Sequence, residues 1–255
     1  MATNRDDSHP PPPQSPAAEV AASLHDGKTH LLLAATGSVA TIKLPHIITS
    51  LSRHQSLSIR VILTKCAARF LPPPEQPHLS QLQSPPTATP TPSAEDYIRS
   101  LPGVDGVYVD EDEWAEPWTR GSEILHIALR RWAHLLLIAP LSANSLAKIV
   151  HGFADNLLTS VVRAWDTTGL IDGKTDARVV VAPAMNTAMW VHPVTGQQIR
   201  VLEEEWGAKK KEGGWFEVLR PIEKNLACGD VGGGAMMEWM DIVAVVEQRL
   251  RLSLS

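Results

Sequence analysis

The chain has 255 residues, of which 44% are hydrophobic and 20% charged, and its formal net charge at pH 7 is −5. A weakly acidic chain of this composition is typical of a globular protein and offers no basic surface for nucleic acid or an anionic membrane. We therefore expect a single domain with one substantial core, no nucleic-acid partner and no membrane partner.

Residues 1–28 are polar and rich in proline, so we expect a disordered tail ahead of a domain that covers 29–255. The tail has acidic residues and a proline run where a secretory signal has an apolar core. No apolar run in the chain approaches the ~20 residues that cross a bilayer. Two cysteines, Cys66 and Cys228, are too few for a disulfide framework and indicate a reducing compartment. These features predict a cytoplasmic protein.

Short apolar runs alternate with helical patterns along the domain. The predicted strands cover 30–36, 58–64, 134–140 and 178–183. The predicted helices cover 37–54, 142–165, 193–206 and 241–252. Apolar strands of four to seven residues that alternate with helices are typical of a parallel sheet covered on both faces. We therefore expect an α/β domain of three layers, a Rossmann- or flavodoxin-like parallel sheet flanked by helices.

Four segments are predicted to lie outside this framework. The segment at about 71–95 is too rich in proline to form a helix or a sheet strand, so we expect a long loop there. We expect a second loop insert at about 167–178. The acidic run 109–114 is interpreted as a solvated surface or a turn. In about 225–240, glycines follow Cys228 closely, which predicts a flap that opens and closes over a ligand.

The turns that follow the predicted strands are built from small and polar residues. They cover 36–40, 63–67, 139–145 and 182–190. Each turn alone is explained as an ordinary helix cap, and the chain contains neither GxGxxG nor a Walker A motif. Because ligands bind at the carboxyl ends of parallel strands, four such turns together favour a nucleotide-like ligand. The chain also lacks CxxC and HExxH, so no metal site is expected.

Three residues have side chains suited to chemistry, and each also has a structural explanation. His126 lies in an apolar stretch, where a histidine is commonly a hydrogen-bonded structural residue. Asn186 follows a predicted strand and would serve as a helix cap. Cys228 is either a small packed side chain or an exposed thiol that donates a proton from a mobile loop.

Four motifs make the chain recognisable. They are TGSVATIKLP at 36–45, the stretch 125–166, VVVAPAMNTAMWVHP at 179–193 and LACGDVGGGAMME at 226–238. In this order they resemble the flavin-dependent cysteine decarboxylases, and within that group the phosphopantothenoylcysteine decarboxylases of coenzyme A biosynthesis. The resemblance extends from about His30 to Leu250.

The resemblance implies a homotrimer that binds FMN without a covalent link, with flavin and substrate at the subunit interfaces. The substrate would be the small molecule 4′-phosphopantothenoylcysteine and the product 4′-phosphopantetheine. His126 would be the base of the oxidative half-reaction, Asn186 would bind the substrate carboxylate and Cys228 would donate a proton in the reductive half-reaction. The residues implied to bind FMN are Gly37, Ser38, Val39, Thr64, Lys65, Ser142, Ala143, Asn144, Ser145 and Ala184. Further substrate contacts would come from Met236, the Ala227 backbone and Asn225, which stands where the family usually has a basic residue.

Two other functions are consistent with this family. One is a halotolerance-type regulatory subunit that binds and inhibits a protein phosphatase, and the other is a decarboxylase of peptidyl cysteine. His126, Asn186 and Cys228 occur in one chain, which favours a self-sufficient enzyme. His134 stands where an acidic residue is usual, and the sequence offers no interpretation of it.

Overall fold

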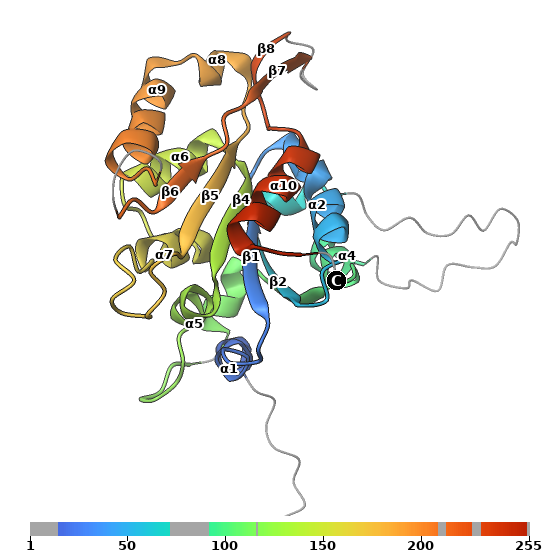
Figure 1. Cartoon of the computed structure of the whole chain (residues 1–255), viewed down its shortest axis with the longest axis vertical. Coiled ribbons are helices and arrows are strands. Elements are labelled where there is room, and N and C mark those ends of the chain that lie inside the picture. Colours follow the sequence, from blue (N-terminus) through green and yellow to red (C-terminus); the bar gives the residue numbers. More distant parts are fainter. Residues whose placement is uncertain (1–14, 72–91, 116, 209–212, 226–230, 254–255) are drawn as a thin grey trace, which may run out of the picture.

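A computed structural model describes residues 15–71, 92–115, 117–208, 213–225 and 231–253. Its centre is a six-stranded parallel sheet in the order β3-β2-β1-β4-β5-β6 (Figure 1). The strands are β1 (Thr29–Ala35), β2 (Leu57–Leu63), β3 (Val104–Tyr108), β4 (Leu135–Leu141), β5 (Arg178–Pro183) and β6 (Phe216–Val218). The predicted three-layer α/β fold is thus confirmed, and all four predicted strands are present within one residue.

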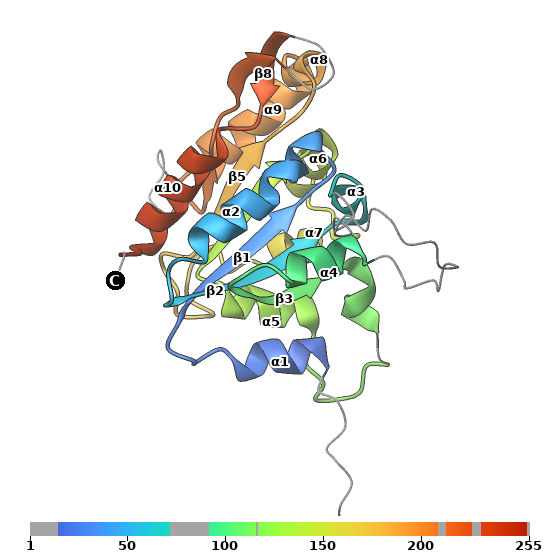
Figure 2. The same ribbon diagram turned by 90° about the vertical axis from the view of Figure 1, so that its right-hand side faces the viewer.

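Helices cover both faces of the sheet (Figures 1 and 2). One face carries α1 (Pro16–Ala22), α5 (Leu125–Trp132), α6 (Ala143–Val150), α7 (Leu157–Arg163) and α9 (Pro193–Arg200). The other carries α2 (Leu44–Leu51), α3 (Lys65–Ala68), α4 (Ala94–Arg99) and α10 (Trp239–Leu250). Four shorter helices complete the chain in its described part: η1 (Val39–Lys43), η2 (Asp110–Trp114), α8 (Thr187–Trp190) and η3 (Val201–Glu205).

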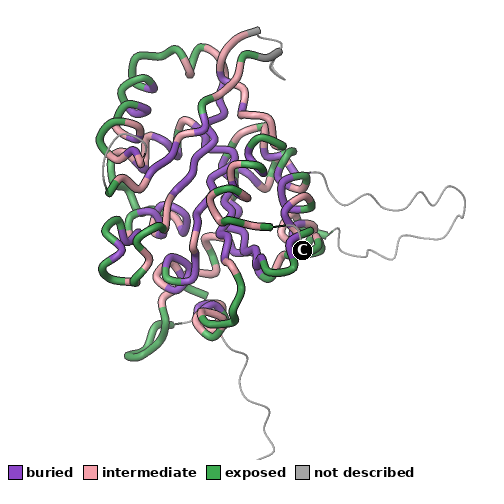
Figure 3. The backbone as a smooth tube through the Cα atoms, viewed as in Figure 1, coloured by how far each residue is buried: buried purple, intermediate pink, exposed green. Residues whose placement is uncertain are grey.

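The pleat of the strands divides the core into two clusters. Side chains alternate between the faces of a strand, so Leu32 of β1 belongs to one cluster and its neighbours Leu31 and Leu33 to the other. Every residue of β2 and β4 is buried, as expected for a strand covered on both faces (Figure 3). The central strands β2 and β4 are thus covered on both faces, and the turns at the strand ends lie at the edge of the sheet.

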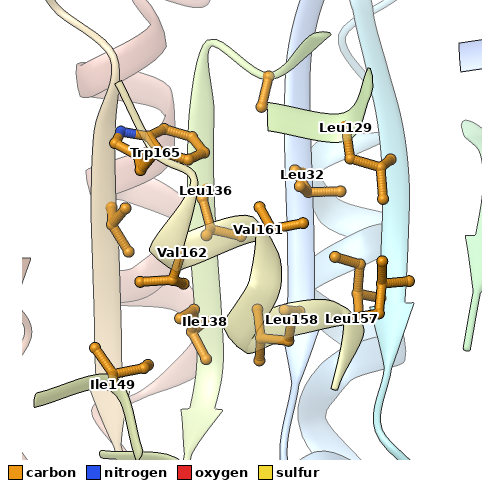
Figure 4. Packing of buried hydrophobic residues seen from close by; sticks show 14 of the residues in the cluster. Leu32, Leu129, Leu136, Ile138, Ile149, Leu157, Leu158, Val161, Val162 and Trp165 are labelled. Carbon is orange, nitrogen blue, oxygen red and sulfur yellow. The ribbon is translucent and has the colours of Figure 1, made fainter. Parts of the chain in front are cut away.

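Helix α7 shows how one face is sealed. Leu158, Val161 and Val162 lie against the sheet, over Leu136 and Ile138 of β4 (Figure 4). Their spacing places them on one side of the helix, so a short helix can bury a continuous apolar stripe. Burial of each such side chain stabilises the fold by roughly 1.5–3 kcal/mol.

The expected single helix over 142–165 is wrong, because the chain forms two helices, α6 and α7. Gly152 has a φ of +73°, a conformation that ends a helix readily only at glycine. Asn156 then begins α7, and its side-chain oxygen accepts a hydrogen bond from the backbone N–H of Thr159 at 2.9 Å. The sequence pattern also missed β3, because its five residues are flanked by loops rather than by apolar periodicity.

The predicted tail over 1–28 is wrong for residues 16–22, which form α1, whereas residues 1–14 lie outside the described part. Ala17 and Val20 are buried against α5, and Arg60 of β2 donates a hydrogen bond to the Ser23 hydroxyl at 3.0 Å. Two apolar contacts and a cap are enough to hold seven residues to an existing core. The predicted loop at 71–95 runs into α4, which starts at Ala94.

His134, which the sequence left without an interpretation, lies at the start of β4. Its ring nitrogen Nδ1 accepts a hydrogen bond from the backbone N–H of His30 at 2.9 Å, and the two imidazoles stack at 4.9 Å. His30 also stacks on Trp132, at 4.4 Å. Burial, with the nearby Lys174 ammonium, lowers the pKa of His134 to about 4. The neutral imidazole thus joins the first residues of two neighbouring strands.

This arrangement predicts acid sensitivity. Folding lowers the pKa of His134. Between about pH 6.5 and pH 4 the imidazole is therefore protonated in the unfolded chain and neutral in the folded chain. Stability from this residue is therefore present above pH 6.5 and is lost as the pH falls toward 4. His134→Asn retains an acceptor but does not titrate. We expect urea unfolding to show that the wild type loses about 1–2 kcal/mol more than the variant between pH 7 and pH 4.5. Equal losses in the two proteins would contradict the assignment.

Candidate active site

A cavity of about 860 Å³ lies at the carboxyl ends of β1, β2, β4 and β5. It is where the strand-end argument placed the ligand. Every residue implied to bind FMN lines it: Gly37, Ser38, Val39, Thr64, Lys65, Ser142, Ala143, Asn144, Ser145 and Ala184. Asn186 and Met236, implied to contact substrate, line the same cavity. Residues from five separate segments of the chain therefore converge on one site.

Hydrogen bonds between turns hold this edge of the sheet together. The Thr36 hydroxyl donates to the carbonyl of Pro140 at 2.9 Å and accepts from the backbone N–H of Ser142 at 2.7 Å. The Thr64 hydroxyl donates to the carbonyl of Ala35 at 3.1 Å. Each bond joins the residue that follows one strand to the end of a neighbouring strand or to the turn after it, so the cavity walls are fixed relative to one another.

Gly37 is required by a close approach. A Cβ atom there would lie 2.8 Å from the Cβ of Cys66, a distance that real Cβ atoms do not show. The absence of a side chain lets the turn after β1 pack against α3 and presents its backbone at the cavity. Cys66 lies on the cavity wall beside it.

The polar end of the cavity is suited to an anion. Helix α6 begins there, and its first-turn N–H groups have no intrahelical partner. Ser142 caps the helix by accepting from the backbone N–H of Ser145 at 3.3 Å, so the structural explanation of this residue is also correct. Hydroxyl groups, a helix N-terminus and the ammonium groups of Lys43 and Lys65 together attract a phosphate.

Lys148 and Asp155 form a pair at the cavity rim. Their charged atoms lie 2.5 Å apart, and the hydrogen bond from Lys148 lowers the pKa of Asp155. The carboxylate stays ionised and offsets the charge of Lys148.

The opposite wall is largely apolar and contains Met185, Met189, Met236, Met237 and Trp239. Such a wall suits a flat ring system. Asn186 also lines the cavity and is the N-cap of α8. Its side-chain oxygen accepts a hydrogen bond from the backbone N–H of Ala188 at 2.8 Å. This bond orients the carboxamide, so capping and ligand binding are compatible roles for one residue.

A hairpin of β7 (Ile222–Asn225) and β8 (Val231–Ala235) lies at the top of Figure 1, and Gly234 and Ala235 of β8 line the cavity. Part of the predicted flap at 225–240 is thus strand β8, and its last two residues begin α10. Cys228 and Ala227 lie outside the described residues, as does the side chain of Asn225.

Two of the three glycines of β8 are explained by close packing rather than by backbone freedom. A Cβ on Gly232 would lie 2.5 Å from a methyl carbon of Thr187, and one on Gly234 would lie 2.5 Å from the carbonyl oxygen of Met185. The backbone N–H of Met185 donates to the carbonyl of Gly234 at 3.0 Å. The hairpin is thereby held against the segment that carries Asn186.

His126 is not among the residues that line the cavity. It is the second residue of α5, and its Nδ1 atom lies 2.7 Å from Oε1 of Glu113. The side chain of His126 is 22% exposed and that of Glu113 only 6%. Of the expected solvated surface or turn at 109–114, the turn is present as η2, but a solvated side chain is wrong for Glu113. Asp110 and Glu113 are three residues apart, and residues with this spacing lie on the same side of a 3₁₀ turn. This spacing was the sequence signal that could have indicated a shared structural role.

In the described part of the chain, no helix combines the length and apolarity needed to span a membrane. The same residues contain no group of three or more His, Cys, Asp or Glu side chains placed to hold a metal ion.

The packing of β8 leads to a paired prediction. Gly234→Ala forces a methyl group onto the Met185 carbonyl, so we expect it to destabilise the protein by about 1–3 kcal/mol. Gly233→Ala is the matched control, because its Cβ would meet its nearest neighbour at an ordinary 3.6 Å. Urea unfolding midpoints of both variants measure the difference. Equal stability would show that β8 is not held against the Met185 backbone.

Comparisons with known proteins identify the family of the chain. The Flavoprotein family model matches residues 19–251. A probable thymidylate synthase of Schizosaccharomyces pombe is 41% identical over 229 residues, or 90% of this chain and 30% of that protein. Coenzyme A biosynthesis protein 3 of Saccharomyces cerevisiae is 36% identical over 251 residues, or 94% of this chain and 37% of that protein. The chain thus spans about a third of the length of these two relatives.

Other relatives match over most of their length. Phosphopantothenoylcysteine decarboxylase of Mus musculus is 39% identical over 221 residues, 86% of each chain. A solved cysteine-to-serine variant of a PPC decarboxylase, complexed with pantothenoylaminoethenethiol, has a TM-score of 0.66, 39% identity and coverage of 87% of this chain and 97% of that one. The FMN binding protein AtHal3 has a TM-score of 0.62, 39% identity and coverage of 87% and 96%. The chain therefore belongs to the Flavoprotein family and, within it, to the phosphopantothenoylcysteine decarboxylases.

Proposed function

We propose that the protein catalyses the FMN-dependent decarboxylation of 4′-phosphopantothenoylcysteine to 4′-phosphopantetheine, a step of coenzyme A biosynthesis. The observation that carries this proposal is the single cavity that gathers the implied FMN-binding residues with Asn186 and Met236. Membership of the decarboxylase family supports the substrate assignment. Two cysteines in 255 residues support a cytoplasmic setting.

The residues of the cavity fit FMN. The start of α6, with Ser142 and Ser145, and the turn at Gly37 would hold the phosphate, and the methionine-rich part of the lining would hold the ring. When bound, FMN supplies the two-electron oxidation of the substrate thiol and the later return of those electrons. The protein supplies orientation and protons.

The chain's own residues then divide the remaining tasks. Asn186 binds the substrate carboxylate through its oriented carboxamide, and Met236 contacts the substrate. His126 accepts the proton of the thiol as the thiol carbon is oxidised to a thioaldehyde. This group is an electron sink beta to the carboxylate, so CO2 leaves and an ene-thiol forms. Cys228 donates a proton from its thiol to the ene-thiol carbon as the electrons return.

The remaining assignments extend the same site. Asn225, together with the Ala227 backbone, contacts the substrate from the hairpin.

We propose a homotrimer in which His126 of one copy serves the cavity of its neighbour. The support is that His126 does not line the cavity of its own chain, although its side chain is 22% exposed. Val39 and Ile42, on the cavity side of the first turn, are 44% and 45% exposed, and they offer apolar surface for a subunit contact.

The first test is mass spectrometry of the purified, FMN-loaded protein after incubation with 4′-phosphopantothenoylcysteine. We expect complete conversion to 4′-phosphopantetheine. A protein that holds FMN and leaves the substrate unchanged would contradict the proposal and favour a regulatory subunit that binds a protein phosphatase.

Cys228→Ser separates the half-reactions in the same assay. Serine is a far weaker proton donor than a thiol, so we expect bound FMN, CO2 release and accumulation of the oxidised ene-thiol, with product formation lowered about 100-fold or more. Normal release of 4′-phosphopantetheine by this variant would overturn the role of Cys228 without affecting the overall reaction.

The trimer predicts complementation between inactive variants. His126→Asn removes the base, and Asn186→Asp places a second negative charge beside the substrate carboxylate. Co-expressed variants should regain about a quarter of the wild-type activity, because random mixing leaves that share of interface sites with both native residues. The check is the decarboxylation rate of the mixed trimer against each variant alone. No recovery would place both residues in the site of one chain.

A further inference from the structure

We infer that Glu113 is a positioning residue that fixes the tautomer of His126, so that Nε2 is the atom that accepts the substrate proton. The inference rests on the proposed function for the role of His126. Glu113 is not a residue of the cavity, so its effect on the reaction would pass through the imidazole of His126.

The two oxygens of Glu113 make different contacts. Oε1 lies 2.7 Å from Nδ1 of His126, and Oε2 accepts the backbone N–H of the same residue at 3.2 Å. An ionised carboxylate can only accept hydrogen bonds. Nδ1 therefore carries the ring proton, and in the neutral imidazole Nε2 is left as the basic atom.

The carboxylate approaches from a turn that is itself fixed. Within η2, the carboxylate of Asp112 accepts the backbone N–H of Val109 at 2.8 Å. Asp110, at the start of η2, accepts the backbone N–H of Leu157 at 2.9 Å and so ties the turn to the first residue of α7. With its side chain only 6% exposed, Glu113 has little room to leave the imidazole.

A purely structural role accounts for only half of this geometry. The residue before α5 is Ile124, which has no side-chain acceptor, and Oε2 of Glu113 stands in as the helix cap. A negative charge at a helix N-terminus is also favourable. Capping does not require Oε1 to meet the imidazole, and a hydrogen bond of 2.7 Å to Nδ1 has a direct chemical consequence for Nε2.

The direct test is the tautomer of His126, read from 15N NMR of histidine-labelled protein at pH 8.5, both without ligand and loaded with FMN. The His126 signals are identified by their loss in His126→Asn. Free neutral histidine carries its proton mainly on Nε2. We expect the wild type to carry it on Nδ1, and Glu113→Gln to shift the population toward Nε2. Glu111→Gln, which removes an exposed carboxylate from the same turn, should leave the Nδ1–H form unchanged.

This measurement does not depend on substrate turnover. A wild-type protein with its neutral proton on Nε2 would overturn the inference, whether or not the protein decarboxylates its substrate. A Glu113→Gln protein that keeps the Nδ1–H form would overturn it as well.

The kinetic consequence separates positioning from folding. We expect Glu113→Gln to lower the rate of CO2 release by roughly 10²–10⁴-fold, with FMN content and KM retained. Glu111→Gln should keep the wild-type rate. Loss of FMN or a higher KM at an unchanged kcat would show a structural role only and contradict the inference. If the wild type itself releases no CO2, the proposed function fails while the tautomer still decides the role of Glu113.

Discussion

The hydroxyl of Thr36 is the junction on which the site depends. It donates to the carbonyl of Pro140 at the end of β4 and accepts the backbone N–H of Ser142, the first residue after that strand. The strands behind it are buried on both faces, so their ends cannot move independently. Because one hydroxyl bonds two buried backbone groups, it holds the segment after β1 against the end of β4. The cavity keeps its shape because these two segments are fixed before any ligand arrives.

The short acidic turn η2 connects this cavity to His126. Asp110 lines the cavity and accepts a hydrogen bond from α7, whereas Glu113 meets α5 and His126. In a 3₁₀ turn the two carboxylates lie on the same side, and each meets the exposed N–H groups of a helix start. The charges that looked like solvated surface in the sequence thus position two helices and one imidazole.

The sequence predicted much of the fold and of the cavity. Buried parallel strands are continuous apolar runs, so β1, β2, β4 and β5 were located by composition alone. The strand-end rule pointed to the edge of the sheet where the cavity lies, and the residues named from the motif resemblance line that cavity. Element boundaries were harder to predict. The end of α6 near Gly152 depends on one positive φ, and the formation of α1 depends on the surface of α5 against which it packs.

What the sequence by itself determined is the class of the protein: an alternating α/β chain with four recognisable motifs, carried by local patterns of apolar and small residues. Only the tertiary structure decided why particular residues are needed. Gly234 must lack a side chain because the Met185 carbonyl packs against it, and His134 is held neutral because folding buries it beside His30 and Lys174. Glu113 meets His126 thirteen residues along the chain. Each of these depends on distances between segments that are far apart in sequence, and no local pattern encodes such distances.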